Sequence, residues 1–251
     1  MGRSLPEMGD WDALFDETYL QTYVPFFDDE RTFEEAFGAV SLAGVAEGAD
    51  VLDCPVGFGR HALLLAAAGY LVTGLDRSET QLAEAERRRG DAEWPRLVRG
   101  DYRALPFADA SFDAVLNLFT SLGYLERDED LGVLREFRRV LRPGGALVIE
   151  TMHRDRLTRF FTARTWDRLP DGSLFLQERE PDWVAGTVSS LHLIVAPDGE
   201  RTERRFVHRA YTPTDWVAML GEAGFLRIDC FSDWGGDKPP MPERRLIIRA
   251  R

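Results

Sequence analysis

The sequence predicts an α/β fold built around a doubly wound, Rossmann-like sheet. Short apolar runs alternate with helix-length segments over residues 50–151, which is the pattern of βαβ units with parallel strands. A glycine-containing turn at residues 53–62 joins the first run to a helix, as expected where a parallel strand passes into its crossover helix. With 251 residues, of which 44% are hydrophobic and 29% charged, we expect residues 1–251 to form a single domain with appendages.

The core elements follow one another in a regular order. We expect five strands, VLDC, LVTGLD, RLVRGD, FDAVLNLF and ALVIET, separated by helices over residues 60–68, 79–89 and about 129–140. A Pro-Gly-Gly sequence at residues 143–145 predicts a turn directly before the fifth strand. Residues 49–151 therefore form the predicted core of the domain.

The first 48 residues, 1–48, predict a helical cap in front of this core. Apolar and aromatic side chains recur at helical spacing on both sides of Pro25, which indicates two amphipathic helices. They are Trp11, Leu14, Phe15, Thr18 and Tyr19 before the proline, and Phe33, Phe37, Val40 and Leu42 after it. Residues 1–50 also hold twelve acidic residues against Arg3 and Arg31, a net charge of −10. This acidic front is either a solvated helical face or a surface that attracts a cationic small molecule.

The C-terminal part predicts an antiparallel insertion and the completion of the main sheet. Residues 152–211 contain three strand-like runs, LFLQERE, TVSSLHLIV and ERRFVHRAY, with a hairpin turn at residues 197–199. This insertion is expected to act as a lid. Residues 212–251 predict a helix and two further strands. Trp234 and the loop of residues 235–242 either shape a pocket at the edge of the sheet or only connect these strands.

Composition excludes several classes of protein. No apolar run reaches the roughly 18 to 20 residues of a membrane helix, and the start MGRSLP has no apolar signal-peptide core. We therefore expect a cytoplasmic protein with no membrane partner. Cys54 and Cys230 are too few for a disulfide framework or a cysteine-rich zinc site, and the four histidines form no metal motif, so no metal is predicted. A net charge of −12 repels phosphate backbones and argues against a nucleic-acid partner.

The turn after the first strand has the form of a nucleotide-binding loop. Gly57 and Gly59 let the backbone turn tightly and approach a ligand, while the following helix start offers unpaired N–H groups. Together with Ala62 they also satisfy the dinucleotide fingerprint GxGxxG/A. Asp76 ends the second strand 17 residues after Gly59, close to the position of an acid that binds a ribose diol. Loop and acid predict an adenosine-containing ligand.

Two further acids favour a cationic ligand over a dinucleotide. Asp53, at the end of the first strand, would lie beside a dinucleotide pyrophosphate, where its charge is unfavourable, but it suits a ligand with an amino group. Asp101 follows the third strand and would point into the same crevice, where it can accept a hydrogen bond from an adenine amine. These acids describe a site for S-adenosylmethionine. Two alternatives stay open: an NAD(P)-dependent oxidoreductase, which leaves Asp53 and Asp101 without a role, and a non-catalytic protein that binds S-adenosylmethionine.

Together these motifs resemble the class I S-adenosylmethionine-dependent methyltransferases, closely over residues 51–151 and less so over residues 173–251. The matching pieces are the DxxxGxG loop, the DxSxxxL segment at Asp76, Ser78 and Leu82, the pair Gly100 and Asp101, and LRPGG at residues 141–145. The resemblance implies that the glycine loop holds the methionine part, that Asp76 binds the ribose hydroxyls, and that Asp101 and Tyr102 frame the adenine. It thus assigns cofactor contacts to Asp53, Gly57, Gly59, Asp76, Asp101 and Tyr102. Pro55 departs from the family, in which many members have a glycine there.

Residues 117–126, NLFTSLGYLE, resemble the small-molecule N-methyltransferases, including aminosugar dimethyltransferases. The resemblance implies methyl transfer to a nitrogen or oxygen of a small-molecule acceptor, with S-adenosylhomocysteine as the product. We add Tyr23 of the cap, Arg77 beside Asp76, and Asn117 and Leu118 after the fourth strand to the expected cofactor contacts. The oligomeric state is left open.

Two residues are candidates for catalysis. His153 follows the fifth strand, at the edge of the sheet where a general base would take a proton from the acceptor; the alternative is a structural role. Tyr124 either orients the acceptor or packs beneath the following helix. His192 and His208 fall in the antiparallel insertion and are expected to be strand-face residues.

Overall fold

The computed structural model describes residues 14–251, which form two sheets flanked by helices. The strands are β1 (Asp50–Asp53), β2 (Leu71–Asp76), β3 (Arg96–Arg99), β4 (Phe112–Asn117), β5 (Leu141–Thr151), β6 (Arg164–Arg168), β7 (Leu174–Asp182), β8 (Thr187–Val195), β9 (Arg201–Arg209), β10 (Ile228–Phe231) and β11 (Leu246–Ala250). The helices are α1 (Glu17–Tyr23), the 3-10 turn η2 (Val24–Phe26), α2 (Asp29–Ala43), α3 (Arg60–Ala67), α4 (Glu79–Arg89), α5 (Arg127–Val140), α6 (Arg154–Phe160) and α7 (Pro213–Glu222). The predicted α/β fold is confirmed; Trp11 of the predicted first helix lies outside the described residues.

The large sheet has the order β10-β11-β5-β4-β1-β2-β3. Strands β1 to β5 pair in parallel, whereas β11 is antiparallel to both β5 and β10. β10 therefore runs in the same direction as β5. Because the chain order reverses between β1 and β4, the carboxyl ends of these two strands flank the crevice in which sheets of this type bind their ligands.

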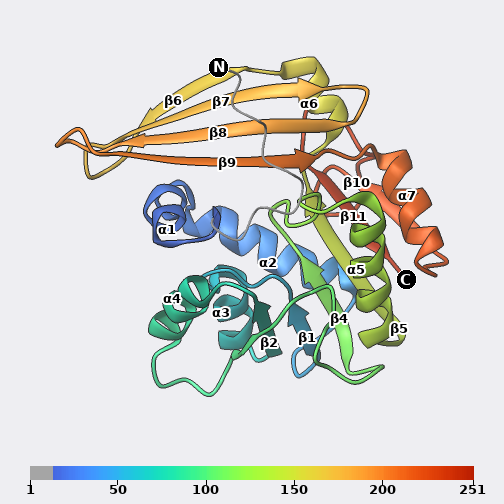
Figure 1. Ribbon diagram of the computed structural model, residues 1–251. Helices are drawn as coiled ribbons and strands as arrows, with labels where there is room; N and C mark the ends of the chain where they lie inside the picture. Colours follow the sequence, from blue (N-terminus) through green and yellow to red (C-terminus); the bar gives the residue numbers. More distant parts are fainter. Residues whose placement is uncertain (1–13) are drawn as a thin grey trace.

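Helices cover both faces of the large sheet (Figure 1). Neighbouring residues of one strand point to opposite faces, so Val51 belongs to one core cluster and Leu52 to the other. The first cluster packs α2, α3 and α4 on the sheet, and the second packs α5 and α7 around the fully buried Phe137 and Trp216. Each such ring contributes about 1.5–3 kcal/mol through burial alone. No described helix is long and apolar enough to span a membrane.

Side-chain caps explain where the flanking helices begin. The Asp28 carboxylate accepts a hydrogen bond from the Arg31 backbone N–H at the start of α2, over 2.6 Å. The Ser78 hydroxyl does the same for α4, and Thr212 begins α7 with a capping box. α2 ends at Gly44, whose φ of 71° is the left-handed conformation that glycine tolerates best. α2 also packs directly on the sheet, so the predicted cap supplies one helix of the main sandwich.

The antiparallel insertion forms a separate four-stranded sheet of order β6-β7-β8-β9. In Figure 1 it is the upper layer, and α1 and α2 lie between it and α3 and α4. The predicted hairpin turn joins β8 to β9. β6 and α6 were not predicted, since RTWDR has almost no buried side chain and therefore no apolar alternation. The predicted turn at residues 143–145 lies inside β5, where the pairing with β4 shifts register between Phe112 and Ala114.

Candidate active site

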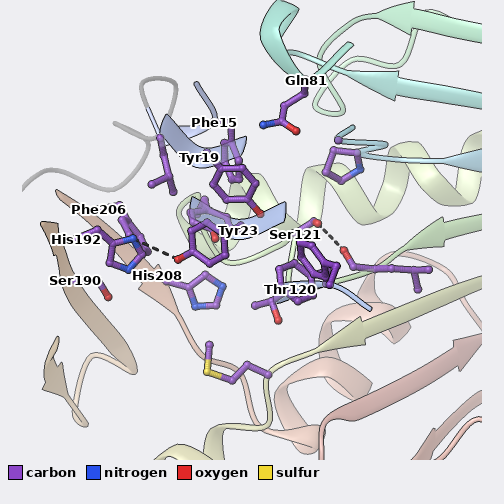
Figure 2. A pocket seen from close by; sticks show the side chains of 18 of the residues that line it. Phe15, Tyr19, Tyr23, Gln81, Thr120, Ser121, Ser190, His192, Phe206 and His208 are labelled. Carbon is purple, nitrogen blue, oxygen red and sulfur yellow. Dashed lines mark hydrogen bonds between the residues drawn. The ribbon is translucent and has the colours of Figure 1, made fainter. Parts of the chain in front are cut away.

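A cavity of about 580 Å³ lies where the loops after β1, β2, β3 and β4 face α1 and the antiparallel sheet (Figure 2). We call its side at these loops the inner half, and the side formed by α6 and the antiparallel sheet the outer half. The outer half is lined by Met152, Arg156, Leu157, Phe160, Phe161, Thr162, Thr165, Gln177, Arg179, Val188, Ser190, His192, Phe206 and His208. Four aromatic side chains line the cavity from α1 and the residues on either side of α1 and η2: Phe15, Tyr19, Tyr23 and Phe27.

The glycine loop and Asp76 meet in the inner half. Gly57 and Gly59 have φ values of 54° and 83°, so both sit in the left-handed region that side chains disfavour. The Gly57 N–H donates to Asp76 Oδ2 over 2.8 Å, and the Ser78 N–H donates to Oδ1 over 2.9 Å. Burial raises the pKa of Asp76, while these backbone donors oppose the rise. Asp76 thus fixes the loop and still borders the cavity.

Asp53, Gly59 and Asn117 are predicted cofactor residues that the structure does not bring to the cavity lining. Asp53 is buried, and its carboxylate accepts from the Ala62 N–H in the first turn of α3, a helix whose N-cap, Gly59, has no side chain to do this. Burial raises the pKa of Asp53 to about 7. Asn117 is also buried, and its Nδ2 donates to the Cys54 carbonyl over 2.8 Å. Both side chains support the loop from behind, so Asp53 does not discriminate between ligands as the sequence argument assumed.

Five further predicted cofactor residues line the cavity. Asp101, Tyr102, Arg77 and Leu118 all border the cavity, together with Tyr23 opposite them. Arg77 Nη1 lies 3.8 Å from Asp101 Oδ2. Burial would raise the pKa of Asp101, but hydrogen bonds from Arg103 outweigh it and lower the pKa below its usual value. Asp101 is therefore a charged acceptor at the rim, and Tyr102 is a buried ring beside it.

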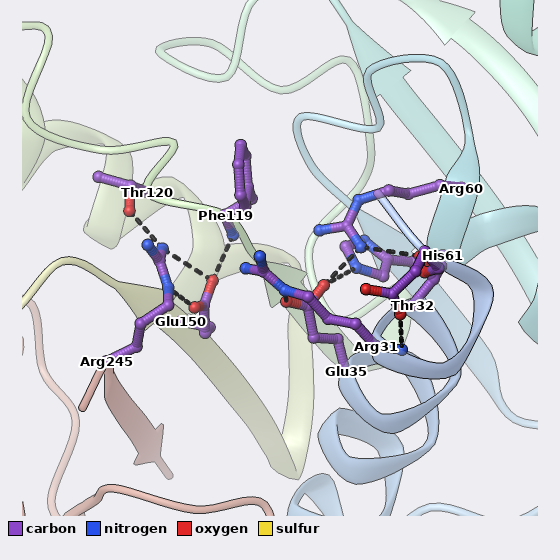
Figure 3. Close-up of polar contacts among 10 residues, drawn as sticks. Arg31, Thr32, Glu35, Arg60, His61, Phe119, Thr120, Glu150 and Arg245 are labelled. Carbon is purple, nitrogen blue, oxygen red and sulfur yellow. Dashed lines mark hydrogen bonds and ion pairs between the residues drawn. The ribbon is translucent and has the colours of Figure 1, made fainter. Parts of the chain in front are cut away.

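A buried ion cluster beneath the loop was missed by sequence reasoning (Figure 3). Glu35 of α2, only 4% exposed, lies 2.5 Å from Arg60 Nη1, 3.0 Å from His61 Nε2 and 2.7 Å from Arg31 Nε. Burial would raise the pKa of Glu35, but the His61 hydrogen bond and the Arg60 charge lower it to about 2. Glu35 looked like one of twelve acids in a charged segment; its position on the apolar side of α2, beside Thr32, was the available signal.

The loop after β4 is held in a strained conformation. Phe119 and Thr120 have φ values of 62° and 58°, which bulky and branched residues rarely adopt. The Phe119 N–H donates to Glu150 Oε2 over 2.8 Å, and Arg245 binds both Glu150 and the Thr120 hydroxyl (Figure 3). The guanidinium carbons of Arg60 and Arg245 lie 5.3 and 5.4 Å from the centre of the Phe119 ring. This contact network fixes Phe119 on the cavity wall.

Two histidines of the antiparallel sheet face the cavity, although they were expected only on strand faces. His192 Nδ1 lies 3.3 Å from the Tyr23 hydroxyl, and His208 Nε2 lies 2.9 Å from the Leu122 carbonyl oxygen. Burial lowers the pKa of each of them to about 4. Figure 2 shows both rings beside Tyr23. Within residues 14–251 no three histidine, cysteine or acidic side chains converge on a point that would hold a metal ion.

Of the two predicted catalytic residues, only one lines the cavity. Tyr124 lines the cavity, edge-on to the His208 ring at a centroid distance of 4.9 Å. His153 does not line it: its Nδ1 accepts from the Asp155 N–H and caps α6, and its side chain is 2% exposed. Trp234 does not line the cavity either. Its side chain packs against Gly38 of α2 so closely that a Cβ atom on Gly38 would lie 2.5 Å from the Trp234 Cβ.

The cavity wall offers unsatisfied polar atoms that fit S-adenosylmethionine. Within the described part of the chain, the Gln81 side-chain amide, Arg60 Nη2 and His208 Nδ1 are buried and lack a hydrogen-bond partner. Gln81 lies beside Gly57 and Asp76, where ribose hydroxyls would be expected, and Arg60 directly follows the glycine loop. Such buried polar groups are costly unless a ligand pairs with them. Gln81 was not predicted, although it lies within the DxSxxxL segment.

Comparisons with known proteins agree with this geometry. Residues 51–145 match the family described as a methyltransferase domain. The putative methyltransferase YqeM of Bacillus subtilis is 26% identical over 246 residues, which is 95% of this chain and 94% of that protein. The demethylmenaquinone methyltransferase of Renibacterium salmoninarum is 41% identical over 110 residues, 44% of either chain, so this chain spans less than half of that relative.

Solved structures confirm the fold. The CcbJ methyltransferase from Streptomyces caelestis superposes with a TM-score of 0.78 at 24% identity, over 92% of this chain and 95% of that one. An amino pentose methyltransferase from Micromonospora echinaspora, solved with S-adenosylmethionine bound, has a TM-score of 0.71 at 20% identity over the whole of both chains. The domain match sets aside the oxidoreductase and the non-catalytic alternative. Residues 51–145 are a methyltransferase domain, and the protein is an S-adenosylmethionine-dependent methyltransferase with S-adenosylmethionine as its cofactor.

Proposed function

We propose that the protein methylates a neutral amine nitrogen of a small molecule. The observation that carries this proposal is the chemistry of the outer half, to which the described residues, 14–251, contribute no acidic side chain. The lining carboxylates within the described residues, Asp76 and Asp101, both belong to the inner half. An ammonium ion would therefore find no counter-charge where the acceptor must lie, so an amine enters that space in its uncharged, nucleophilic form.

The state of the titratable side chains supports the same conclusion. Burial lowers the pKa of His192 and His208 to about 4, so both are uncharged at neutral pH. Burial raises the pKa of Tyr124 to about 12 and moves that of Tyr23 in the same direction. An environment that suppresses charge on these groups also lowers the pKa of an amine placed among them.

A hydroxyl acceptor is a poorer fit. An alcohol or phenol needs a base that removes its proton as the methyl group is transferred, and the best base has a pKa near the operating pH. A histidine with a pKa of about 4 is too weak for this task, and the tyrosines are protonated. An amine needs no such base, because its lone pair is available before the reaction.

The proposed cofactor contacts use the inner half. Asp76 and Gln81 bind the ribose hydroxyls, Asp101 and Tyr102 frame the adenine, and Arg60 Nη2 binds the carboxylate of the methionine part. S-adenosylmethionine supplies a methyl group already activated by a positively charged sulfur. The task left to the chain is alignment, which can supply up to about 7 to 11 kcal/mol of the barrier.

His208 is the proposed orienting residue. A carbonyl oxygen can only accept, so His208 Nε2 carries the proton that the Leu122 carbonyl receives, and Nδ1 keeps its lone pair. Nδ1 is buried without a partner in the described residues and can accept an N–H from the acceptor. This aims the amine lone pair at the methyl carbon: the new N–C bond forms as the C–S bond breaks, and the resulting ammonium releases its proton to water.

Relatives support a small-molecule acceptor. The amino pentose methyltransferase described above has the same fold, and its name states an amino sugar type of substrate. We also propose that the chain divides at residues 48, 151 and 211 and that the antiparallel insertion acts as a lid. A cytoplasmic location is part of the same proposal. Tyr23 and Tyr19, stacked at 4.5 Å, form the proposed contact between the N-terminal helices and the bound cofactor.

A labelled-methyl screen tests the function. The protein is incubated with deuterated-methyl S-adenosylmethionine and matched compounds that differ only in carrying an amine or a hydroxyl at the same position. The proposal expects mass-labelled products from amines, with the amount of S-adenosylhomocysteine matching the product. Labelled products from the hydroxyl series alone would overturn it.

A further inference from the structure

The five arginines that line the cavity differ in their partners. Arg60 pairs with Glu35, Arg245 with Glu150, and Arg77 lies 3.8 Å from Asp101. Arg156 and Arg179 have no carboxylate within 4.0 Å in the described part of the chain. These two are also the cationic side chains of the outer half, where the acceptor is proposed to bind.

Arg179 is the better placed of the two. Arg156 is exposed on α6, so water solvates its charge. Arg179 is half-buried on β7, and its guanidinium donates to the Thr162 carbonyl over 3.3 Å and to Gln177 Oε1. Both acceptors are neutral. The Asp167 carboxylate acts on Arg179 only at longer range, so a half-buried guanidinium whose hydrogen bonds go to neutral groups keeps positive charge that an incoming anion would compensate.

The place of Arg179 suits an anchor for the acceptor's far end. It borders both the main cavity and a second hollow of about 440 Å³, which is lined by residues 163–164, 178–180, 189–191 and 205 and by no residue of the inner half, so it lies at the end of the cavity away from the glycine loop. The inner half lies at the opposite end. Gln177 Oε1 also accepts from the Thr165 hydroxyl, over 2.9 Å, which fixes the amide against which Arg179 rests.

From this arrangement we infer that the acceptor carries an anionic group, a carboxylate or a phosphate ester, which Arg179 binds while the amine points to the inner half. This inference rests on the proposed function and narrows its substrate class. The chain as a whole has a net charge of −12, so its long-range field repels anions. Since no acidic side chain of residues 14–251 lines the outer half, Arg179 gives that space a local positive charge, which favours an anion there despite the repulsive long-range field.

A pair of dyes tests the inference without knowledge of the acceptor. 8-Anilinonaphthalene-1-sulfonate is anionic and aromatic, and N-phenyl-1-naphthylamine is the same molecule without its sulfonate. Both are titrated by fluorescence into the whole protein saturated with S-adenosylhomocysteine, which fills the inner half. We expect Arg179→Gln to weaken binding of the anionic dye by about tenfold and to leave the neutral dye unchanged.

The controls separate charge from structure. Arg168→Gln, which removes an exposed arginine of β6 outside the cavity lining, is expected to change neither dye. Arg179→Lys keeps the charge and is expected to retain most of the preference for the anionic dye. An unchanged affinity of Arg179→Gln for the anionic dye, or an equal loss for both dyes, overturns the inference.

Displacement identifies the anion. Benzoate and phenyl phosphate compete with the bound anionic dye, and the stronger competitor shows whether Arg179 prefers a carboxylate or a phosphate ester. Displacement by neither, or equally by benzyl alcohol, counts against an anion site. Calorimetry with S-adenosylhomocysteine is run on the same samples: loss of that binding contradicts the proposed cofactor contacts, whereas the dye comparison alone judges Arg179.

Discussion

The Nε2 atom of His208 lies 2.9 Å from the carbonyl oxygen of Leu122. Since that oxygen cannot donate, the contact assigns the proton to Nε2 and leaves Nδ1 as an acceptor without a partner among the described residues. Gly123, next to Leu122, permits this close approach, because a Cβ there would lie 2.8 Å from Nε2. A backbone carbonyl thereby selects the tautomer of the histidine that we propose to orient the acceptor.

His208→Phe removes the proposed acceptor while keeping a planar ring. With an acceptor from the amine screen, we expect methyl transfer to slow by about twofold to tenfold, because one hydrogen bond between neutral groups contributes about 0.5–1.5 kcal/mol. The calorimetric affinity for S-adenosylhomocysteine stays the same. The control is His153→Asn, which keeps a capping side chain outside the cavity and leaves the rate unchanged; equal rates for His208→Phe and the control would remove His208 from the mechanism.

Asp76 and Asp53 differ in their predicted contribution to cofactor binding. Asp76→Asn replaces a charged acceptor that borders the cavity, so we expect S-adenosylhomocysteine to bind about tenfold to a hundredfold more weakly. Asp53→Asn changes a side chain behind the loop and is expected to alter this affinity far less. Titration calorimetry measures this affinity for both variants. A larger loss of affinity for Asp53→Asn than for Asp76→Asn would contradict the supporting role assigned to Asp53.

Glu35 is predicted to be a main source of stability at the cofactor loop. Glu35→Gln leaves the buried Arg60 without its counter-charge, and breaking a buried pair from one side costs about 3–5 kcal/mol. The adjacent Glu34 is exposed, so Glu34→Gln is expected to change the free energy of unfolding by less than about 0.5 kcal/mol. Urea denaturation measures both. Similar values for the two variants would contradict the role assigned to the cluster.

Stability is predicted to rise with pH up to about pH 6.5. Burial lowers the pKa of His61, His192 and His208 to about 4, so between pH 4 and 6.5 the unfolded chain binds more protons than the folded one. Raising the pH over this range therefore stabilises the fold, by up to about 3 kcal/mol for each histidine.

Buried acids act in the opposite direction. Burial raises the pKa of Asp53 and Asp130 from 3.8 to about 7, so the folded state holds more protons and loses stability as the pH rises to 7. Below pH 6.5 the stabilising effect of the three histidines on the free energy of unfolding exceeds the destabilising effect of the two acids as the pH rises. Above pH 6.5 only the two acids change it. Thermal unfolding at a series of pH values should show a maximum near pH 6.5, and Asp130→Asn should flatten the alkaline side; a monotonic profile would contradict this balance.

The fold was predictable because its signals are local and repeated. Each parallel strand of the core is a short apolar run followed by a helix with its own cap, such as Ser78 for α4. The edge strand β6 was missed, since exposed side chains leave no periodicity to detect. α1 and α2 were predicted as a cap, whereas α2 buries Ala36, Ala39 and Val40 against the main sheet. The amphipathic pattern of α2 shows that one of its faces is buried, but it does not identify the surface on which that face packs.

The inner half of the site was also predictable, and the outer half was not. Gly57, Asp76 and Asp101 follow strands of one parallel sheet, so their meeting at one edge follows from topology. His208 and Arg179 lie on an antiparallel sheet whose docking over the crevice is set by tertiary contacts alone. His153 was chosen because it follows β5, yet its side chain turns back to cap α6. The end of β5 determines where His153 lies, but the Asp155 N–H determines where its side chain points.

The most direct test of N-methylation is the chemical shift of the transferred carbon. The protein is supplied with S-adenosylmethionine carrying a ¹³C-labelled methyl group and with an acceptor from the matched screen that bears both an amine and a hydroxyl. We expect one new ¹³C resonance at the shift of a nitrogen-bound methyl group, absent in samples without protein and reduced with His208→Phe. A resonance at the shift of an oxygen-bound methyl group would contradict the central claim that the acid-free outer half binds a neutral amine.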